Sequence, residues 1–350
     1  MYCSDLNGTV VFAVSEIKVC SPGTKYLIPS LRYEGGEFPL DEFLMLRDIT
    51  QGEINDGNSP CLNCPNIKRG NARPGKYLFS TVEICNYRYC NARCSYCDSW
   101  QPEMQDTYAV RYRVYPVIKW MFDNNLIDPK GLLIWGGGEP TINVEFDEIT
   151  RLAMDHRMRM FVNTSGIVYS DVLADALRNG LATVQCSLDS GDADTYIAMK
   201  GRDRFEQIVE NLTLYAEKNP DNIVLKYIIN DKNNSDGSIV GFLNIAKRLG
   251  ITRIALSPEA KEAWAGEISI ATLGAINIFL HEAKKRRLSV DVFYSLFGEE
   301  YSKLIKETCE VQTPPPDWAI RYFNRLSPGL QKRIRKVYEI LRDSSLTEPD

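Results

Sequence analysis

Short apolar runs alternate with amphipathic segments along most of this chain, from about residue 76 to residue 295. The runs are continuous rather than alternating, which is typical of strands buried on both faces. Between them, apolar residues recur at helical spacing, for example over 114–121, 172–177 and 205–212. The predicted strands are Tyr77–Ile84, Leu132–Trp135, Met158–Asn163, Thr183–Leu188, Ile223–Ile229 and Ile251–Leu256, with Leu288–Phe293 as a seventh candidate. Six strand-then-helix units predict an α/β fold with a parallel sheet, either open or closed into a partial barrel.

The two ends of the chain have a different character. Residues 1–75 predict a hairpin, Thr9–Val14 with Glu16–Val19, and one short helix, Asp41–Arg47, in a stretch rich in glycine, proline and asparagine. Such a segment buries little core, so we expect it to need a staple. Residues 296–350 predict a helical extension with a hinge at Pro314–Pro316. The predicted parts are therefore 1–75, 76–295 and 296–350.

Composition is that of a globular protein, with 44% hydrophobic and 25% charged residues among 350. The formal net charge is −5, which favours neither a nucleic-acid partner nor another polyanion. The first residues show no basic segment leading into an apolar one, and no apolar run approaches ~18 residues. We therefore expect no signal peptide, no membrane contact and a cytoplasmic location.

Cysteine usage changes the picture. Eight of the ten cysteines fall within the first 97 residues. Because the cytoplasm keeps thiols reduced, this clustering indicates metal ligation more than disulfides.

The sharpest motif is a C-x3-C-x2-C loop directly after the first strand of the parallel sheet, formed by Cys90, Cys94 and Cys97. Three thiolates on one loop can hold three irons of a cubane and leave the fourth iron without a protein ligand. A structural zinc site would need a fourth ligand to close its tetrahedron.

Two further motifs follow predicted strands. Gly136-Gly137-Gly138-Glu139 ends the second strand, where glycines allow the backbone to approach a ligand closely. Cys186-Ser187-Leu188-Asp189-Ser190-Gly191 ends the fourth strand and is followed by Tyr196 and Lys200-Gly201. In parallel α/β folds the chemistry lies at these carboxyl ends of the strands.

Together these motifs resemble the radical S-adenosylmethionine (SAM) superfamily, over roughly Tyr77 to Leu256. The resemblance implies a partial (β/α)6 radical SAM barrel with a [4Fe–4S] cluster on Cys90, Cys94 and Cys97. It also implies SAM contacts from Tyr96, beside the last cysteine of the loop, and from Gly137, Gly138 and Glu139, at the methionyl amino group. Ser187 and Asp189 are then expected near the SAM ribose, with Asn163 as a further contributor; for each of these a capping or turn role is the alternative.

Lys226 stands inside an otherwise apolar strand, and a buried lysine needs an anionic partner. We expect either the SAM carboxylate or a structural ion pair.

Four cysteines precede the barrel: Cys3, Cys20, Cys61 and Cys64. Four thiolates suffice for a second, auxiliary [4Fe–4S] cluster or for structural zinc. The arrangement is similar to the SPASM and twitch auxiliary-cluster groups, although those groups usually carry the module after the barrel. Cys309 and Cys186 are candidates for catalytic thiols, Cys309 as a hydrogen-atom donor to a substrate radical. For Cys309 the alternative is an incidental cysteine on a helix end, and Cys186 points either into the barrel or away from it.

The resemblance implies reductive cleavage of SAM to a 5′-deoxyadenosyl radical that abstracts hydrogen from a substrate. A peptide or protein substrate is our first hypothesis, and a sugar or nucleotide-linked small molecule is the second. A flavodoxin or ferredoxin reductant is then expected. The rival from another class is a non-catalytic iron–sulfur or zinc protein.

Overall fold

The computed structural model describes residues 2–3, 5–20, 29–64, 67–68, 70, 76–100 and 112–310. Its internal contacts define two compact units. The first unit comprises Met1–Ala92, Cys97–Gln185 and Glu217–Asn222, and the second comprises Arg93–Tyr96, Cys186–Ala216 and Ile223–Asp350.

The first unit is built on a mixed sheet whose central strands are parallel. β6 (Phe79–Cys85) pairs in parallel with β7 (Ile127–Trp135), and β7 pairs in parallel with β8 (Arg159–Thr164). The predicted hairpin is confirmed as β2 (Thr9–Ala13) and β3 (Glu16–Lys18), which are antiparallel, and β4 (Ser30–Arg32) continues it. Because β2 also pairs in parallel with β6, the hairpin extends the central sheet.

A second, two-stranded ladder lies at the start of the chain. β1 (Tyr2–Cys3) pairs antiparallel with β5 (Ile67–Lys68), so that Cys3 lies opposite Ile67. This pairing brings the first residues of the chain to the segment that follows Cys64.

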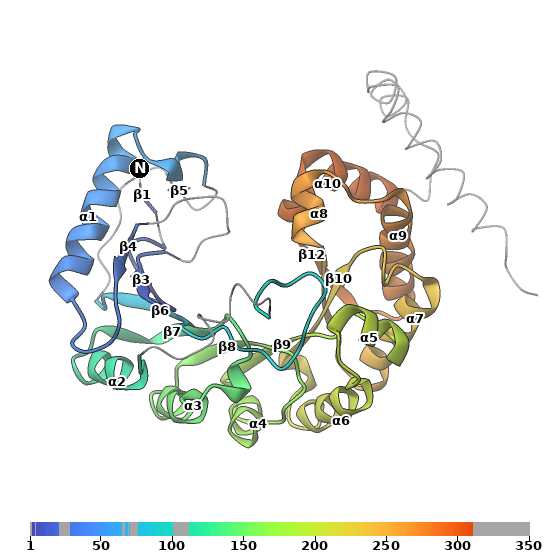
Figure 1. Ribbon diagram of the computed structural model, residues 1–350, viewed down its shortest axis with the longest axis horizontal. Helices are drawn as coiled ribbons and strands as arrows, with labels where there is room; N and C mark the ends of the chain where they lie inside the picture. The colour runs from blue at the N-terminus through green and yellow to red at the C-terminus, as the bar shows by residue number, and fades with distance from the viewer. Residues whose placement is uncertain are drawn as a thin grey trace, which may run out of the picture. The chain divides into compact units, whose positions relative to one another are not determined.

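Helices cover one side of the parallel strands in the first unit, as Figure 1 shows for the three helices below β6, β7 and β8. These helices are α2 (Tyr115–Asp123), α3 (Phe146–Asp155) and α4 (Asp171–Arg178). The first unit also contains the short 3-10 helices η1 (Pro60–Asn63), η3 (Pro140–Ile142) and η4 (Pro220–Asn222). The helix expected over Asp41–Arg47 is longer, α1 (Leu40–Asp56), because buried Thr50 and Ile54 continue its packed face. It ends at Gly57, which adopts the left-handed conformation that glycine tolerates.

The expectation of strands buried on both faces is wrong for β6. Val82 and Ile84 are buried, whereas the alternate side chains of Thr81, Glu83 and Cys85 are only half-buried. Strands β8 and β9 (Ala182–Ser187) show the same alternation. The helices pack against one face, and the other face carries polar side chains.

The second unit has its own parallel strands. β10 (Ile223–Ile229) pairs with β11 (Arg253–Pro258), and β11 pairs with β12 (Ser289–Val292), which confirms the seventh candidate strand. β9 contributes residues to both units. The helices are α5 (Ala193–Lys200), α6 (Phe205–Ala216), α7 (Asp236–Arg248), α8 (Ala260–Ala265), α9 (Ile270–Lys285) and α10 (Tyr294–Glu310). The parallel α/β fold class is thereby confirmed.

Each unit has an aromatic core. In the second, the ring of Tyr227 lies 4.9 Å from that of Phe242 and 5.2 Å from that of Phe279. In the first, the ring of Phe43 from α1 lies 5.6 Å from those of Phe38 and Phe79. Helix α1 is therefore part of the core that also packs β6.

The expected hinge at Pro314–Pro316 and the last helices lie outside the described residues. Within the described part of the chain, no helix combines the length and apolarity needed to cross a membrane.

We predict that Phe43→Ala lowers the free energy of unfolding of the first unit by about 3–5 kcal/mol, because it leaves a cavity among packed aromatic rings. Phe43 is 0% exposed, whereas Met45 on the same helix is 59% exposed, so Met45→Ala is the matched control. Urea unfolding followed by the fluorescence of Trp120, whose ring lies 6.3 Å from Phe38, measures the difference. Equal midpoints for the two variants would contradict this account of α1.

Candidate active site

The carboxylate of Glu139 joins the ends of two parallel strands in the first unit. Glu139 is 1% exposed. Its Oε1 accepts hydrogen bonds from the amide and hydroxyl of Thr141, at 3.1 and 2.8 Å, and from the hydroxyl of Thr164, at 2.7 Å. Its Oε2 accepts from the amide of Ser165 at 2.5 Å. A buried carboxylate needs this number of donors to offset its lost hydration.

The glycine turn before Glu139 lies against the start of the cysteine loop. Gly138 has φ +44°, and a Cβ built on it would lie 2.5 Å from the carbonyl oxygen of Tyr89. That same carbonyl accepts a hydrogen bond from the amide of Glu139 at 2.8 Å. A larger residue at position 138 would displace the backbone just before Cys90, so the glycine is required by close approach.

The three cysteines of the loop are partly exposed. Cys90 and Cys97 belong to the first unit and Cys94 to the second. The amide of Ala92 donates to Cys90 Sγ at 3.4 Å, and Cys97 Sγ donates to the hydroxyl of Ser99 at 3.3 Å. Across the described residues, no three cysteine, histidine or acidic side chains already form a gathered metal-ligating group.

Asp189, at the end of β9, is 0% exposed and has φ +57°. Its Oδ2 accepts hydrogen bonds from the Lys200 ammonium at 2.5 Å and from the Tyr96 hydroxyl at 2.6 Å. Its Oδ1 accepts from the amide of Ile228 at 2.7 Å. Both oxygens are occupied by protein donors, so a contact with a ribose hydroxyl would have to replace one of them.

Electrostatics agree with these donor assignments. Burial and the charge of Asp189 raise the pKa of Tyr96 well above its ordinary value, so the hydroxyl keeps its proton and donates it. Burial lowers the pKa of Lys200, but the charges of Asp189 and Cys94 outweigh it and raise that pKa to about 12. Lys200 is therefore cationic at neutral pH.

Lys226 on β10 is half-buried, and burial lowers the pKa of its ammonium. Among the described residues it forms no salt bridge; its Nζ lies 5.2 Å from the centre of the Phe293 ring. The structural ion pair that we considered is thus not observed in this part of the chain. The SAM carboxylate stays a prediction.

The remaining predicted residues occupy varied positions. Asn163 accepts from the side chain of Gln185 at 2.8 Å and donates to the carbonyl of Trp135 at 3.3 Å. Ser187 is half-buried, whereas Cys186 is fully buried in the second unit, where its charge would act on Lys200. The side chain of Cys309 lies outside the described residues.

The N-terminal cysteines lie close enough to act on each other electrostatically, all within the first unit. Burial, followed by the charges of Cys3, Asp5, Cys64 and Cys61, raises the pKa of Cys20 to about 12. Burial also raises the pKa of Cys3, and the charge of Cys64 acts in the same direction.

Local structure explains this proximity. Ser59 caps η1 by accepting from the amide of Cys61, and the amide of Cys64 donates back to the carbonyl of Cys61 at 2.8 Å. The ladder between β1 and β5 then places Cys3 opposite Ile67, three positions after Cys64. The spacing of Cys61 and Cys64 predicted a pair, and the ladder adds Cys3 to it.

Cys85, the last residue of β6, forms a polar contact and does not pack only against apolar side chains. Its thiol donates to Glu83 Oε1 at 3.2 Å. Burial, followed by the charge of Glu83, raises the pKa of this thiol.

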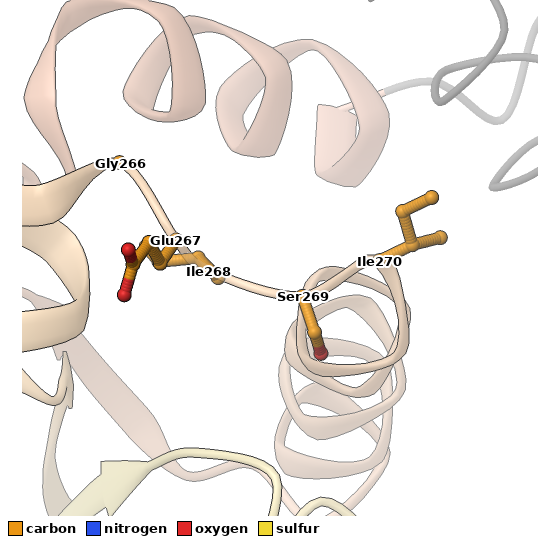
Figure 2. A pocket seen from close by; sticks show the side chains of 5 residues that line it. All are labelled: Gly266, Glu267, Ile268, Ser269 and Ile270. Carbon is orange, nitrogen blue, oxygen red and sulfur yellow. The ribbon is translucent and has the colours of Figure 1, made fainter.

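A pocket of about 390 Å³ is found elsewhere, on the loop between α8 and α9 (Figure 2). Five consecutive residues, Gly266–Ile270, line it. Glu267 is the one ionisable side chain among them, and we assign the pocket no part in the chemistry.

Comparison with known proteins agrees with the motifs. Residues 86–244 match the model of the Radical SAM superfamily. The match includes the cysteine loop, the glycine turn with Glu139, and Asp189 with Lys200.

Among curated proteins, the chain is similar to mycofactocin maturase MftC of Mycobacterium tuberculosis, with 28% identity over 135 residues that cover 37% of this chain and 34% of that protein. It is also similar to GTP 3′,8-cyclase of Synechococcus elongatus, with 28% identity over 145 residues that cover 40% of this chain and 42% of that protein. The chain thus spans less than half the length of these relatives. Among solved structures, SuiB of Streptococcus suis bound to S-adenosylmethionine matches with a TM-score of 0.48 and 14% identity, over 73% of this chain and 56% of that one.

Sequence reasoning missed the role of Lys200. The motif includes Lys200, but its two partners could not be predicted. Asp189 lies 11 positions and Tyr96 104 positions away in the chain. One signal in the sequence indicates a buried Lys200. The residue lies directly before Gly201, which ends the helix, and one turn after Tyr196, which is buried.

We predict that Glu139→Gln lowers the free energy of unfolding by about 2–4 kcal/mol, because an amide cannot accept from donors on both sides and charge-assisted hydrogen bonds are lost. Glu148→Gln is the control, since that side chain is 52% exposed, and we expect a change within about 0.5 kcal/mol. Urea unfolding of the metal-free proteins measures both. Equal stability of the two variants would show that the strand-end hydrogen bonds contribute little.

Proposed function

We propose that this chain is a radical SAM enzyme in which Cys90, Cys94 and Cys97 hold a [4Fe–4S] cluster that binds SAM. The observation that carries the proposal is the backbone anchoring of the cysteine loop. In the first unit, the amide of Glu139 donates to the carbonyl of Tyr89. In the second unit, Arg93 and Ser95 donate to carbonyls at the end of α5. A loop held in this way keeps its ligands in position for metal binding.

The donor set fits the group. The loop offers three partly exposed thiols and no fourth cysteine, which suits a cubane with one iron left open for a chelating ligand. When bound, the reduced cluster supplies the electron that cleaves SAM to methionine and a 5′-deoxyadenosyl radical.

The chain's own residues would bind and orient SAM. Gly137 and Gly138 let the backbone approach the methionyl group, and Glu139 would accept from its ammonium. Lys226 would supply a positive charge suited to the carboxylate, since it forms no salt bridge among the described residues, although the charge of Asp189 acts on its pKa. Tyr96, Asn163, Ser187 and Asp189 stay candidates for the adenosine part.

We propose a second metal centre on Cys3, Cys20, Cys61 and Cys64. Their mutual effect on the pKa values of Cys20 and Cys3 supports a common site. A site of four thiolates is complete without an outside ligand, so we assign it an auxiliary [4Fe–4S] cluster, with zinc as the alternative. Since a cysteine binds metal as its thiolate, we expect metal binding at this site to depend on pH.

The substrate is proposed at the level of a class. A peptide or protein is the first candidate. A sugar or nucleotide-linked small molecule is the second, and the match to a GTP 3′,8-cyclase supports its nucleotide form. The two are discriminated by which addition, a candidate peptide or a nucleotide, raises 5′-deoxyadenosine above the substrate-free level. A flavodoxin or ferredoxin would supply the electron.

We predict that the reconstituted protein, given SAM and dithionite without oxygen, forms 5′-deoxyadenosine, and that Cys94→Ala reduces the yield by at least about 100-fold (a loss of ~2.7 kcal/mol or more in transition-state stabilisation). The physical reason is the loss of one iron ligand of the cluster that cleaves SAM. Chromatographic quantification of 5′-deoxyadenosine measures it, and Cys85→Ala, which alters a cysteine outside the loop, is the control.

A wild-type protein with full iron that forms no more product than Cys94→Ala, both alone and with substrate candidates, would contradict the proposal. It would favour the rival in which the chain is a non-catalytic iron–sulfur or zinc protein.

We predict that the double variant Cys61→Ala/Cys64→Ala loses the iron of one cluster while the SAM-responsive cluster remains. Elemental analysis for iron and zinc, together with electron paramagnetic resonance of the reduced protein, measures this. Loss of zinc instead of iron would replace the auxiliary cluster by a structural zinc site. An unchanged metal content would remove the second centre from the proposal.

A further inference from the structure

Lys200 and Asp189 form a buried ion pair for which SAM binding provides no explanation. Lys200 ends α5 and is 3% exposed, and Asp189 is 0% exposed. Their side chains meet at 2.5 Å, and the Lys200 ammonium also donates to the Tyr96 hydroxyl at 2.6 Å. Replacing a buried pair by apolar residues is often neutral or stabilising, so its presence asks for a role beyond stability.

The end of α5 also holds the backbone on both sides of Cys94. The carbonyl of Lys200 accepts from the amide of Arg93, and the carbonyl of Met199 accepts from the amide of Ser95, each at 2.8 Å. Carbonyls in the last turn of a helix have no partner within the helix, which leaves them available for such bonds.

The residue after Lys200 is restricted by the same contact. Gly201 has φ +61°, and a Cβ built on it would lie 2.7 Å from the carbonyl oxygen of Arg93. A glycine here both ends α5 and admits the cysteine loop.

The polar side chains at this anchor reach the thiol itself. The Tyr96 hydroxyl is a hydrogen-bond partner of Cys94, and a negative charge on the Cys94 sulfur would raise the pKa of both Tyr96 and Lys200. The loop therefore carries, next to one of its three thiols, a buried positive charge and a hydroxyl. Net charge and hydrogen bonds at the sulfurs are what set the reduction potential of an iron–sulfur cluster.

We propose that Lys200, held by Asp189 and Tyr96, is a positioning residue that fixes Cys94 as an iron ligand and makes the cluster easier to reduce. The inference rests on the proposed function, because it takes Cys94 as a cluster ligand. Lys200 would then affect how readily the cluster accepts an electron, without contacting the substrate.

The test compares reduction potentials in reconstituted full-length protein. Lys200→Met removes the charge and both donated hydrogen bonds. Lys247→Met is the matched control, since Lys247 is also in the last turn of a helix, α7, but is exposed. Lys200→Arg retains the charge, and Lys200→Met/Asp189→Asn removes both charges together.

The readout is the midpoint potential of the paramagnetic signal that changes on SAM addition, with iron content measured in parallel. We expect a more negative potential in Lys200→Met, a wild-type potential in Lys247→Met, and a return toward wild type in the double variant. Lys200→Arg should lie closer to wild type than Lys200→Met. A purely structural role would not follow charge in this order.

An unchanged potential in Lys200→Met with full iron would overturn the inference. If Lys200→Met does not fold, Tyr96→Phe decides, because it removes only the hydroxyl beside Cys94. A more negative potential in Tyr96→Phe supports the inference, and a wild-type potential overturns it.

Failure of the proposed function has a different signature. It would appear as iron content and signal that do not depend on Cys94, measured with Cys94→Ala. That result would remove both proposals, whereas Cys94-dependent iron with an unchanged potential removes only this one.

Discussion

A carboxylate buried at the end of a parallel strand costs free energy unless donors surround it, and this protein meets that constraint once in each unit. Glu139 meets it in the first unit with donors from Thr141, Thr164 and Ser165. Asp189 meets it in the second unit with Lys200, Tyr96 and a backbone amide. The backbone amide of Glu139 also bonds to the carbonyl of Tyr89, just before the cysteine loop. The backbone carbonyl of Lys200 bonds to the amide of Arg93, within that loop. The hydrogen bonds that offset the cost of burial thus lie next to bonds that hold the cysteine loop, whose thiols are the proposed metal ligands.

This arrangement separates two tasks among the charged residues. Glu139 and Asp189 each accept several hydrogen bonds from the protein, which hold their segments in place. Lys226 forms no salt bridge in the described residues, and it is the residue that we propose for an anionic group of the ligand. A buried carboxylate whose hydrogen bonds are all formed specifies one conformation, because the loss of any single bond leaves a buried polar group unpaired.

The N-terminal segment is more closely integrated than its composition suggests. Its glycine- and proline-rich sequence favoured a separate stapled module, yet β2 pairs with β6 and Phe43 packs against Phe79. The proposed second metal centre would then stabilise the β1–β5 ladder and the η1 turn rather than a whole domain. A metal bound there would act at the edge of a unit that has a core of its own.

Local pattern was sufficient for most strands and helices of the parallel region, because apolar runs and helical spacing are properties of neighbouring residues. It failed where tertiary contact changed the outcome. The segment Asp128–Gly131 has the composition of a turn, but β7 continues through it, because a register shift opposite Phe79 and Thr81 accommodates it. Gly131 permits this, since a Cβ there would lie 2.3 Å from the carbonyl of Ser80. Burial on one face only, as in β6, likewise depends on which layer the helices form.

The cysteine spacing and the glycine turn could be read from the chain alone, since a cluster loop and a close backbone approach demand particular residues at fixed short intervals. The role of Lys200 could not, because Tyr96 lies 104 positions away in the chain. A lysine on a helix is ordinarily a solvated residue, and only the fold turns this one inward against a carboxylate. Contacts between distant residues are decided by packing, and at this site packing determines which charge lies beside the thiol.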